Sequence, residues 1–117
     1  MFDLDNITEE ATTSNDLEEV VMGLIINSGQ ARSLAYTALK KAKEGDLAAA
    51  HQLMAQSREA LNAAHLVQTQ LIEDDQGEGK IPVTLVLVHA QDHLMTSMLA
   101  RELISELIEL HEKLQKK

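Results

Sequence analysis

Two histidines and one carboxylate lie within five residues of each other in an otherwise apolar stretch, at His89, Asp92 and His93. On a helix the two histidines would lie one turn apart, with Asp92 about 60° around the axis from His89. Imidazole and carboxylate groups can bind a metal or act as general acids and bases, and a neutral imidazole can attack a phosphoryl group. The spacing leaves these chemistries open, together with a purely structural role in a helical interface.

A zinc hydrolase and a general acid–base enzyme have the least support from this cluster. Residues 89–93 resemble the H-x-x-E-H arrangement of zinc hydrolases, but aspartate replaces the glutamate and no third ligand follows at a recognisable spacing. Acid–base catalysis would need a nucleophile or an oxyanion hole, and the sequence shows neither. His51 and His65 have no second ligand at helical spacing, so we expect them to be structural or exposed.

A phosphohistidine carrier requires less of the chain, because phosphoryl transfer depends mainly on positioning and charge stabilisation. A histidine early in a helix, flanked by apolar residues that could dock a partner, meets that requirement. The structural alternative treats both histidines as satisfied within a helical interface and Asp92 as a device for specificity. It leaves unexplained why a carboxylate and a histidine lie next to each other.

Three long helices are predicted to position the cluster. We expect them from Asn15 to Gly45, from Asp46 to about Ile72, and from Pro82 or Thr84 to Leu114, after a flexible acidic leader at 1–15. Residues 16–117 then form one helical domain. One proline, five glycines and two aromatic residues among 117 favour long helices around an aliphatic core. Small residues interrupt the first helix and suggest close approach by a neighbouring backbone: Gly23, Asn27, Ser28 and Gly29.

The third predicted helix is apolar on nearly every side in its first half. One stripe, with Asp92 at its centre, is predicted to face the core and contains Leu85, Val88, Met95, Leu99, Leu103, Leu107, Leu110 and Leu114. Two neighbouring helices cannot also cover the outer sector, which carries Leu87, Leu94 and Met98. We therefore expect a homo-oligomer with Asp92 at or near a subunit contact, because a carboxylate on an apolar face is costly unless paired, protonated or metal-bound.

Charge and composition limit the partners. The chain has 10 Lys and Arg against 19 Asp and Glu, a formal net charge of -9. This disfavours nucleic acid and anionic membranes and allows a basic partner protein. The lack of cysteine excludes disulfides and thiolate chemistry within the chain. We find no targeting segment and no apolar run long enough to cross a bilayer, so we expect a cytoplasmic protein.

Residues 86–96 resemble the signature of the enzyme IIA components of the lactose/cellobiose/N,N'-diacetylchitobiose class of the bacterial phosphotransferase system. The first predicted helix agrees with it at 26–33, 38–42 and 45–46. The resemblance spans roughly Leu17 to Leu114 and is closest to the chitobiose/cellobiose branch. It implies an all-α fold, an antiparallel three-helix bundle that assembles into a homotrimer.

The resemblance also implies a function for the cluster. His89 matches the phosphorylated histidine, which accepts a phosphoryl group on Nε2 from the histidine-containing phosphocarrier protein and donates it to the cysteine of enzyme IIB. The pathway serves uptake of a β-linked disaccharide such as N,N'-diacetylchitobiose or cellobiose through a separate membrane permease, IIC. The alternative is a helical oligomeric adaptor or regulator that never carries phosphate.

Further roles follow from the same resemblance. Asp92 matches a buried aspartate near the three-fold axis, where one divalent cation per trimer, such as magnesium, would neutralise three carboxylates at the subunit interface. His93 is a candidate contact for the phosphoryl group, and Gln91 a candidate contact to a neighbouring subunit's site. The candidates for contact with partner proteins are Leu87, Met95 and Met98.

Overall fold

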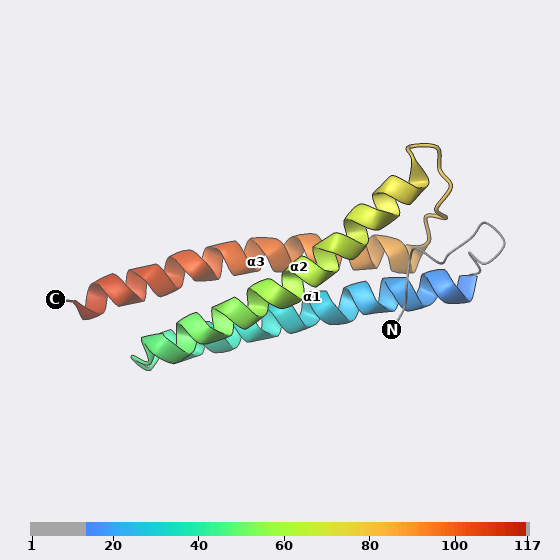
Figure 1. Ribbon diagram of the computed structural model, residues 1–117. Coiled ribbons are helices and arrows are strands. Elements are labelled where there is room, and N and C mark those ends of the chain that lie inside the picture. Colours follow the sequence, from blue (N-terminus) through green and yellow to red (C-terminus); the bar gives the residue numbers. More distant parts are fainter. Residues whose placement is uncertain (1–13, 117) are drawn as a thin grey trace.

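Three long helices make up the computed structural model, which describes residues 14–116 (Figure 1). They are α1 (Ser14–Lys43), α2 (Leu47–Asp75) and α3 (Leu85–Gln115), and the described residues contain no strand. The predicted all-α, three-helix fold is confirmed. The predicted leader lies outside the described residues, except that its last two residues already belong to α1.

Side-chain caps determine where two of the helices begin. The Asp46 carboxylate accepts a hydrogen bond of 3.1 Å from the backbone N–H of Ala49 at the start of α2. The Thr84 hydroxyl accepts one of 3.2 Å from Leu87 at the start of α3, so Pro82 lies before that helix. Gly45, with φ of 89°, has the left-handed conformation that commonly follows the end of a helix, as predicted for α1.

The second helix is longer than predicted. It continues past Ile72 to Asp75, and Gln76 then adopts a left-handed conformation with φ of 54°. The Asp75 carboxylate accepts backbone hydrogen bonds from Ile81 at 2.8 Å and Gly79 at 3.3 Å. These bonds fold the connecting loop back over the end of α2, which sequence periodicity could not indicate.

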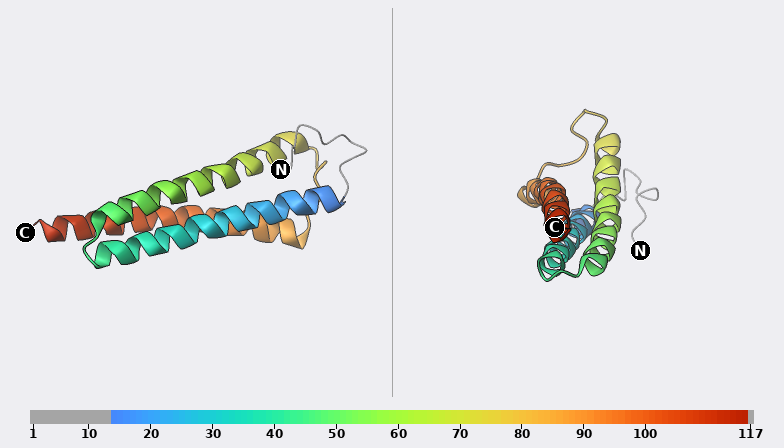
Figure 2. Two further views of the ribbon diagram at one scale, coloured as in Figure 1. Left: turned by 60° about the horizontal axis from the view of Figure 1, so that its bottom comes forward. Right: turned by 90° about the vertical axis from the view of Figure 1, so that its left-hand side faces the viewer.

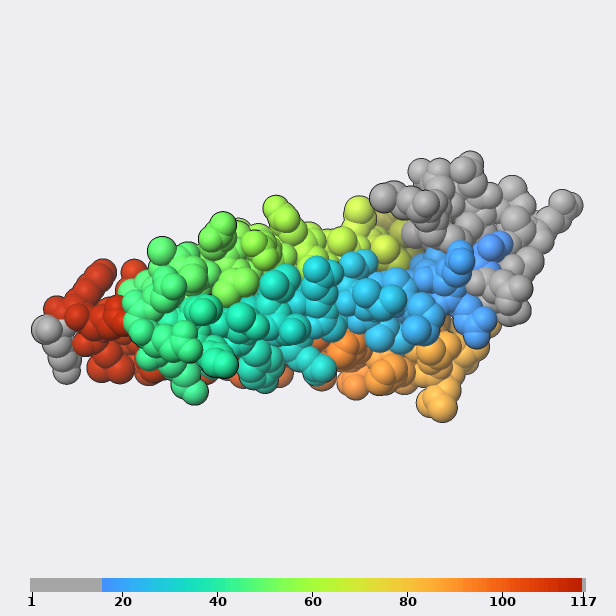
Figure 3. All heavy atoms as spheres, turned by 90° about the horizontal axis from the view of Figure 1, so that it is seen from below, coloured from blue at the N-terminus to red at the C-terminus, as the bar shows by residue number. Residues whose placement is uncertain are grey.

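Consecutive helices run antiparallel, so α1 and α3 run in the same direction and α2 runs against both (Figure 1). The C-terminal end of α2 diverges from α3, and the loop that joins them crosses the resulting gap (Figure 2). On the face shown in Figure 3, α1 lies between the other two helices. None of the helices in the described part of the chain could cross a membrane.

The core within one chain has two apolar parts. One part surrounds Leu24 and Leu94, which are fully buried among residues of all three helices. The other combines Met54, Ile104 and Ile108 with alanines that let the helices approach closely: Ala35, Ala38, Ala42 and Ala50. Buried serines occur on all three helices at positions 28, 57 and 97.

The orientation predicted for α3 is wrong for the single chain. The stripe expected in the core is exposed instead, from 42% at Leu107 to 87% at Leu85, and we call it the outer stripe: Leu85, Val88, Met95, Leu99, Leu103, Leu107, Leu110 and Leu114. The opposite side packs against α1 and α2, through Leu87, Ala90, Leu94, Ser97, Ile104 and Ile108. Periodicity identified both apolar sectors, but it could not say which one faces the chain's own helices.

Candidate functional site

The predicted histidine pair lies near the start of α3. The ring centroids of His89 and His93 are 6.0 Å apart, and their planes differ by 13°. His89 is exposed, whereas His93 is half-buried. Because the Thr84 cap fixes where α3 begins, His89 lies in its second turn, where a docking protein can reach the imidazole.

His93 packs against the backbone of α1 at Gly29. A Cβ added to Gly29 would lie 3.2 Å from Nε2 of His93, tighter than most real contacts. Burial, followed by the charges of Arg32 and His89, lowers the pKa of His93 below its ordinary value, while Asp92 opposes this lowering. The imidazole is therefore neutral near pH 7, with one nitrogen that donates a hydrogen bond and one that accepts.

Asp92 is exposed and lies among the apolar residues of the outer stripe, between Val88 and Met95. The expectation that it lies on a core face is thus wrong within one chain, because that face is open. The described residues of a single chain contain no group of three His, Cys, Asp or Glu that could hold a metal ion. A metal at Asp92 would need carboxylates from further copies of the chain.

The other predicted contact residues lie in different places. The side-chain oxygen of Gln91 accepts a hydrogen bond from Gln68 of α2 within the same chain. Leu87 is buried in the chain's own core and cannot contact a partner in this conformation. Met98 packs partly against that core, whereas Met95 is exposed.

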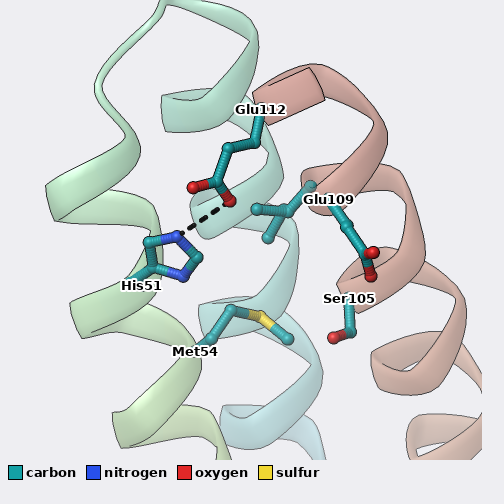
Figure 4. A pocket seen from close by; sticks show the side chains of 6 residues that line it. His51, Met54, Ser105, Glu109 and Glu112 are labelled. Atoms are coloured by element: carbon teal, nitrogen blue, oxygen red, sulfur yellow. Dashed lines mark ion pairs between the residues drawn. The ribbon is translucent and has the colours of Figure 1, made fainter. Parts of the chain in front are cut away.

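A second set of polar side chains helps to line a hollow of about 310 Å³ between the start of α2 and the C-terminal third of α3 (Figure 4): His51, Ser105, Glu109 and Glu112. His51 Nε2 lies 3.4 Å from a carboxylate oxygen of Glu112, and both side chains are partly exposed. Sequence spacing missed this partner because it lies on a different helix. From His93 to Glu112, α3 rises roughly 30 Å, so the hollow is separate from the histidine pair.

Comparisons with known proteins find relatives that match nearly the whole chain. The family described as the lactose/cellobiose-specific IIA subunit of the PTS system matches residues 19–112. The N,N'-diacetylchitobiose-specific EIIA component of Escherichia coli K12 is 76% identical over 115 residues, which cover 98% of this chain and 99% of the relative. The cellobiose-specific EIIA component of Lactococcus lactis is 42% identical over 107 residues, 91% of either chain.

Two solved structures share the fold. The E. coli IIA(Chitobiose) chain, solved in solution as a complex with HPr, superposes with a TM-score of 0.76 at 81% identity, covering 85% of this chain and 96% of that one. The cellobiose-specific enzyme IIA from Bacillus anthracis gives a TM-score of 0.81 at 40% identity, covering 94% and 99%.

Proposed function

Because this chain belongs to the lactose/cellobiose-specific IIA family of the phosphotransferase system, we propose that His89 carries its phosphoryl group. The chain is a phosphotransferase component that takes a phosphoryl group from HPr, the histidine-containing phosphocarrier protein, and relays it to enzyme IIB. Exposure is the observation that favours His89 over His93. His89 is open to a partner, whereas Nε2 of His93 lies against Gly29.

The transfer needs a neutral His89 with its lone pair on Nε2. That lone pair attacks phosphorus, and the new N–P bond forms as the donor's N–P bond breaks, with the donor imidazole keeping the electron pair. In the second step the cysteine thiolate of IIB attacks the same phosphorus, and His89 regains its lone pair. The thiolate must come from IIB because this chain has no cysteine. The protein contributes positioning and charge rather than a further covalent step.

His93 would support the phosphoryl group without accepting it. Its ring lies one turn from His89 with the two centroids 6.0 Å apart, so an oxygen of a phosphoryl group on His89 could reach a nitrogen at the edge of the His93 ring. A neutral imidazole can donate one N–H to such an oxygen. The packing against Gly29 holds the ring in this orientation, so His93 acts as a fixed hydrogen-bond donor.

The outer stripe supports assembly into a homotrimer. It runs along nearly all of α3, and a continuous exposed apolar surface of this kind marks a protein contact. If three copies pack their outer stripes around one axis, three Asp92 carboxylates meet in apolar surroundings and repel one another. Carboxylate oxygens are the ligands that magnesium prefers, so one divalent cation per trimer would neutralise them.

The transported sugar follows from similarity rather than from the site. High identity to the E. coli relative supports N,N'-diacetylchitobiose, with cellobiose as the second candidate. The sugar itself is bound by the permease IIC, and this chain would act beside it in the cytoplasm. An adaptor that never carries phosphate, the alternative raised by the sequence, would not require an exposed histidine at this position.

Intact-mass analysis after incubation with phosphoenolpyruvate, enzyme I and HPr tests the assignment of His89. Wild type and His93→Ala should each gain one acid-labile phosphoryl group per chain, and His89→Ala none. His65→Ala removes an exposed histidine of α2 that is not one of the pair, serves as the control and should behave as wild type. Labelling of His89→Ala together with loss of labelling in His93→Ala would reverse the assignment.

A further inference from the structure

Arg32 places a positive charge beside the histidine pair, on the neighbouring helix. Gly29 lies against His93, and α1 and α3 run in the same direction (Figure 1). Arg32 follows Gly29 by three residues and therefore lies on the same face of α1, one turn further on. Helical side chains lean toward the N-terminus, which brings the guanidinium back toward the level of His93.

The charge of Arg32 has no carboxylate partner among the described residues. Its side chain is exposed and makes no ion pair there, although its charge acts on the His93 imidazole. The described lysines lie at the helix ends and in the loop: Lys40, Lys41, Lys43, Lys80, Lys113 and Lys116. Arg101 belongs elsewhere, since it donates to the backbone oxygen of Met54 on α2.

We propose that Arg32 is a second contact for the phosphoryl group on His89, reaching it from α1 along the open side of His93. The inference rests on the proposed phosphorylation of His89. A phosphoryl dianion that approaches a chain of net charge -9 meets a repulsive field, which a cation beside the histidine pair would reduce. A guanidinium offers both charge and paired N–H donors that match phosphoryl oxygens.

Gly29 makes this arrangement sterically feasible. A side chain at that position would press on Nε2 of His93, one turn before Arg32 on the same helix. The phosphoryl group would then be held from two helices, with His89 and His93 on α3 and Arg32 on α1. Neither helix alone could surround it.

The test compares Arg32→Ala and Arg32→Lys with Arg58→Ala, which removes an exposed arginine of α2 outside this site. Each full-length chain is phosphorylated with phosphoenolpyruvate, enzyme I and HPr. We would measure the transfer rate from HPr, the ³¹P chemical shift of the phosphohistidine, and its half-life after separation from HPr. Helical content and oligomeric state are checked for each variant.

Arg32→Ala should slow transfer roughly ten- to a hundredfold, the effect of losing a charged hydrogen bond. It should also shift the phosphorus resonance and change the half-life, with partial recovery in Arg32→Lys and no effect in Arg58→Ala. Slower transfer with an unchanged resonance and half-life would mean that Arg32 only docks HPr, which overturns the proposal. Wild-type behaviour of Arg32→Ala overturns it while leaving His89 intact. Absence of phosphorylation in the wild type overturns both.

Discussion

Gly29 of α1 and His93 of α3 pack so closely that a Cβ on the glycine would lie 3.2 Å from Nε2 of the imidazole. Glycine costs a helix interior roughly 0.5–1 kcal/mol relative to alanine. This glycine therefore lowers the stability of α1, but its lack of a side chain lets the His93 ring pack directly against the helix backbone. The orientation of His93, and with it the shape of the phosphoryl site, depends on that contact.

Gly29→Ala should therefore slow phosphoryl transfer from HPr without unfolding the protein, because the new methyl group displaces the His93 ring. The gain in helix propensity and the strained contact should nearly cancel in the free energy of unfolding. Gly23→Ala is the matched control on the same helix, since a Cβ there meets nothing within 4 Å. It should stabilise the chain by about 0.5–1 kcal/mol in urea denaturation and leave transfer unchanged. Equal transfer rates for both variants would contradict the role given to this contact.

Asp75 should make the loop after α2 sensitive to acid. The backbone N–H of Ile81 lowers the pKa of the Asp75 carboxyl, helped by the N–H groups of Gly79 and its neighbours and opposed by burial. A carboxyl whose pKa is depressed by folding stabilises the fold above its unfolded pKa, here near 3.8, and that stability is lost as the pH falls through the folded pKa.

Proteolysis of the loop as a function of pH measures this effect. Cleavage within 76–84 should increase on acidification below about pH 4 in the wild type. It should already be faster at pH 7 in Asp75→Asn, since an amide holds two backbone donors less well than a carboxylate. Asp74→Asn is the matched control, because within residues 14–116 Asp74 accepts a hydrogen bond only from the Gln70 side chain. Equal cleavage of the two variants would rule out the loop-closing role.

The outer stripe should be necessary for assembly. Leu103 is 56% exposed in one chain, and burying a lysine there without a partner would be costly. Leu103→Lys should therefore shift the protein toward monomers in sedimentation velocity. Helical content should fall only in segments that the subunit contact stabilises. Glu102→Lys introduces the same charge at the neighbouring exposed position and should leave the oligomer intact. An unchanged sedimentation coefficient for Leu103→Lys would exclude the stripe as the contact.

Local signals in the sequence predicted the helices well. Asp46 and Thr84 cap their helices by accepting hydrogen bonds from residues three positions later. Gly45 follows the end of α1 in a left-handed backbone conformation of its own. Short-range sequence patterns are therefore enough to predict these three helix boundaries. The histidine spacing likewise predicted that His89 and His93 would meet, because one helix fixes both.

Contacts between helices were harder to predict. Periodicity found two apolar sectors on α3 but assigned the outer stripe to the wrong side, since both sectors repeat every three or four residues. The small residues Ala90 and Ser97, fully buried against α1 and α2, mark the true inner face. Arg32 beside His93, and His51 beside Glu112, depend on how one helix is placed along another, and spacing within a single helix carries no information about that.

Asp92→Leu should raise the stability of the assembled protein in metal-free buffer. In one chain Asp92 interrupts the outer stripe between Val88 and Met95 and is exposed. If three copies meet at that level, leucine removes the mutual repulsion of three carboxylates and completes the apolar contact. Replacing buried ionic groups with apolar ones of similar size is worth about 1–4 kcal/mol in favourable cases.

Thermal unfolding with and without magnesium distinguishes the effect of charge from that of added apolar surface. Magnesium should raise the melting temperature of the wild type and leave that of Asp92→Leu unchanged, because the variant has no carboxylates to neutralise. Asp92→Asn keeps the polar shape without the charge and should also lose the magnesium response, but with a smaller gain in metal-free buffer. A lower melting temperature for Asp92→Leu than for the wild type in metal-free buffer would refute the placement of Asp92 at the subunit axis.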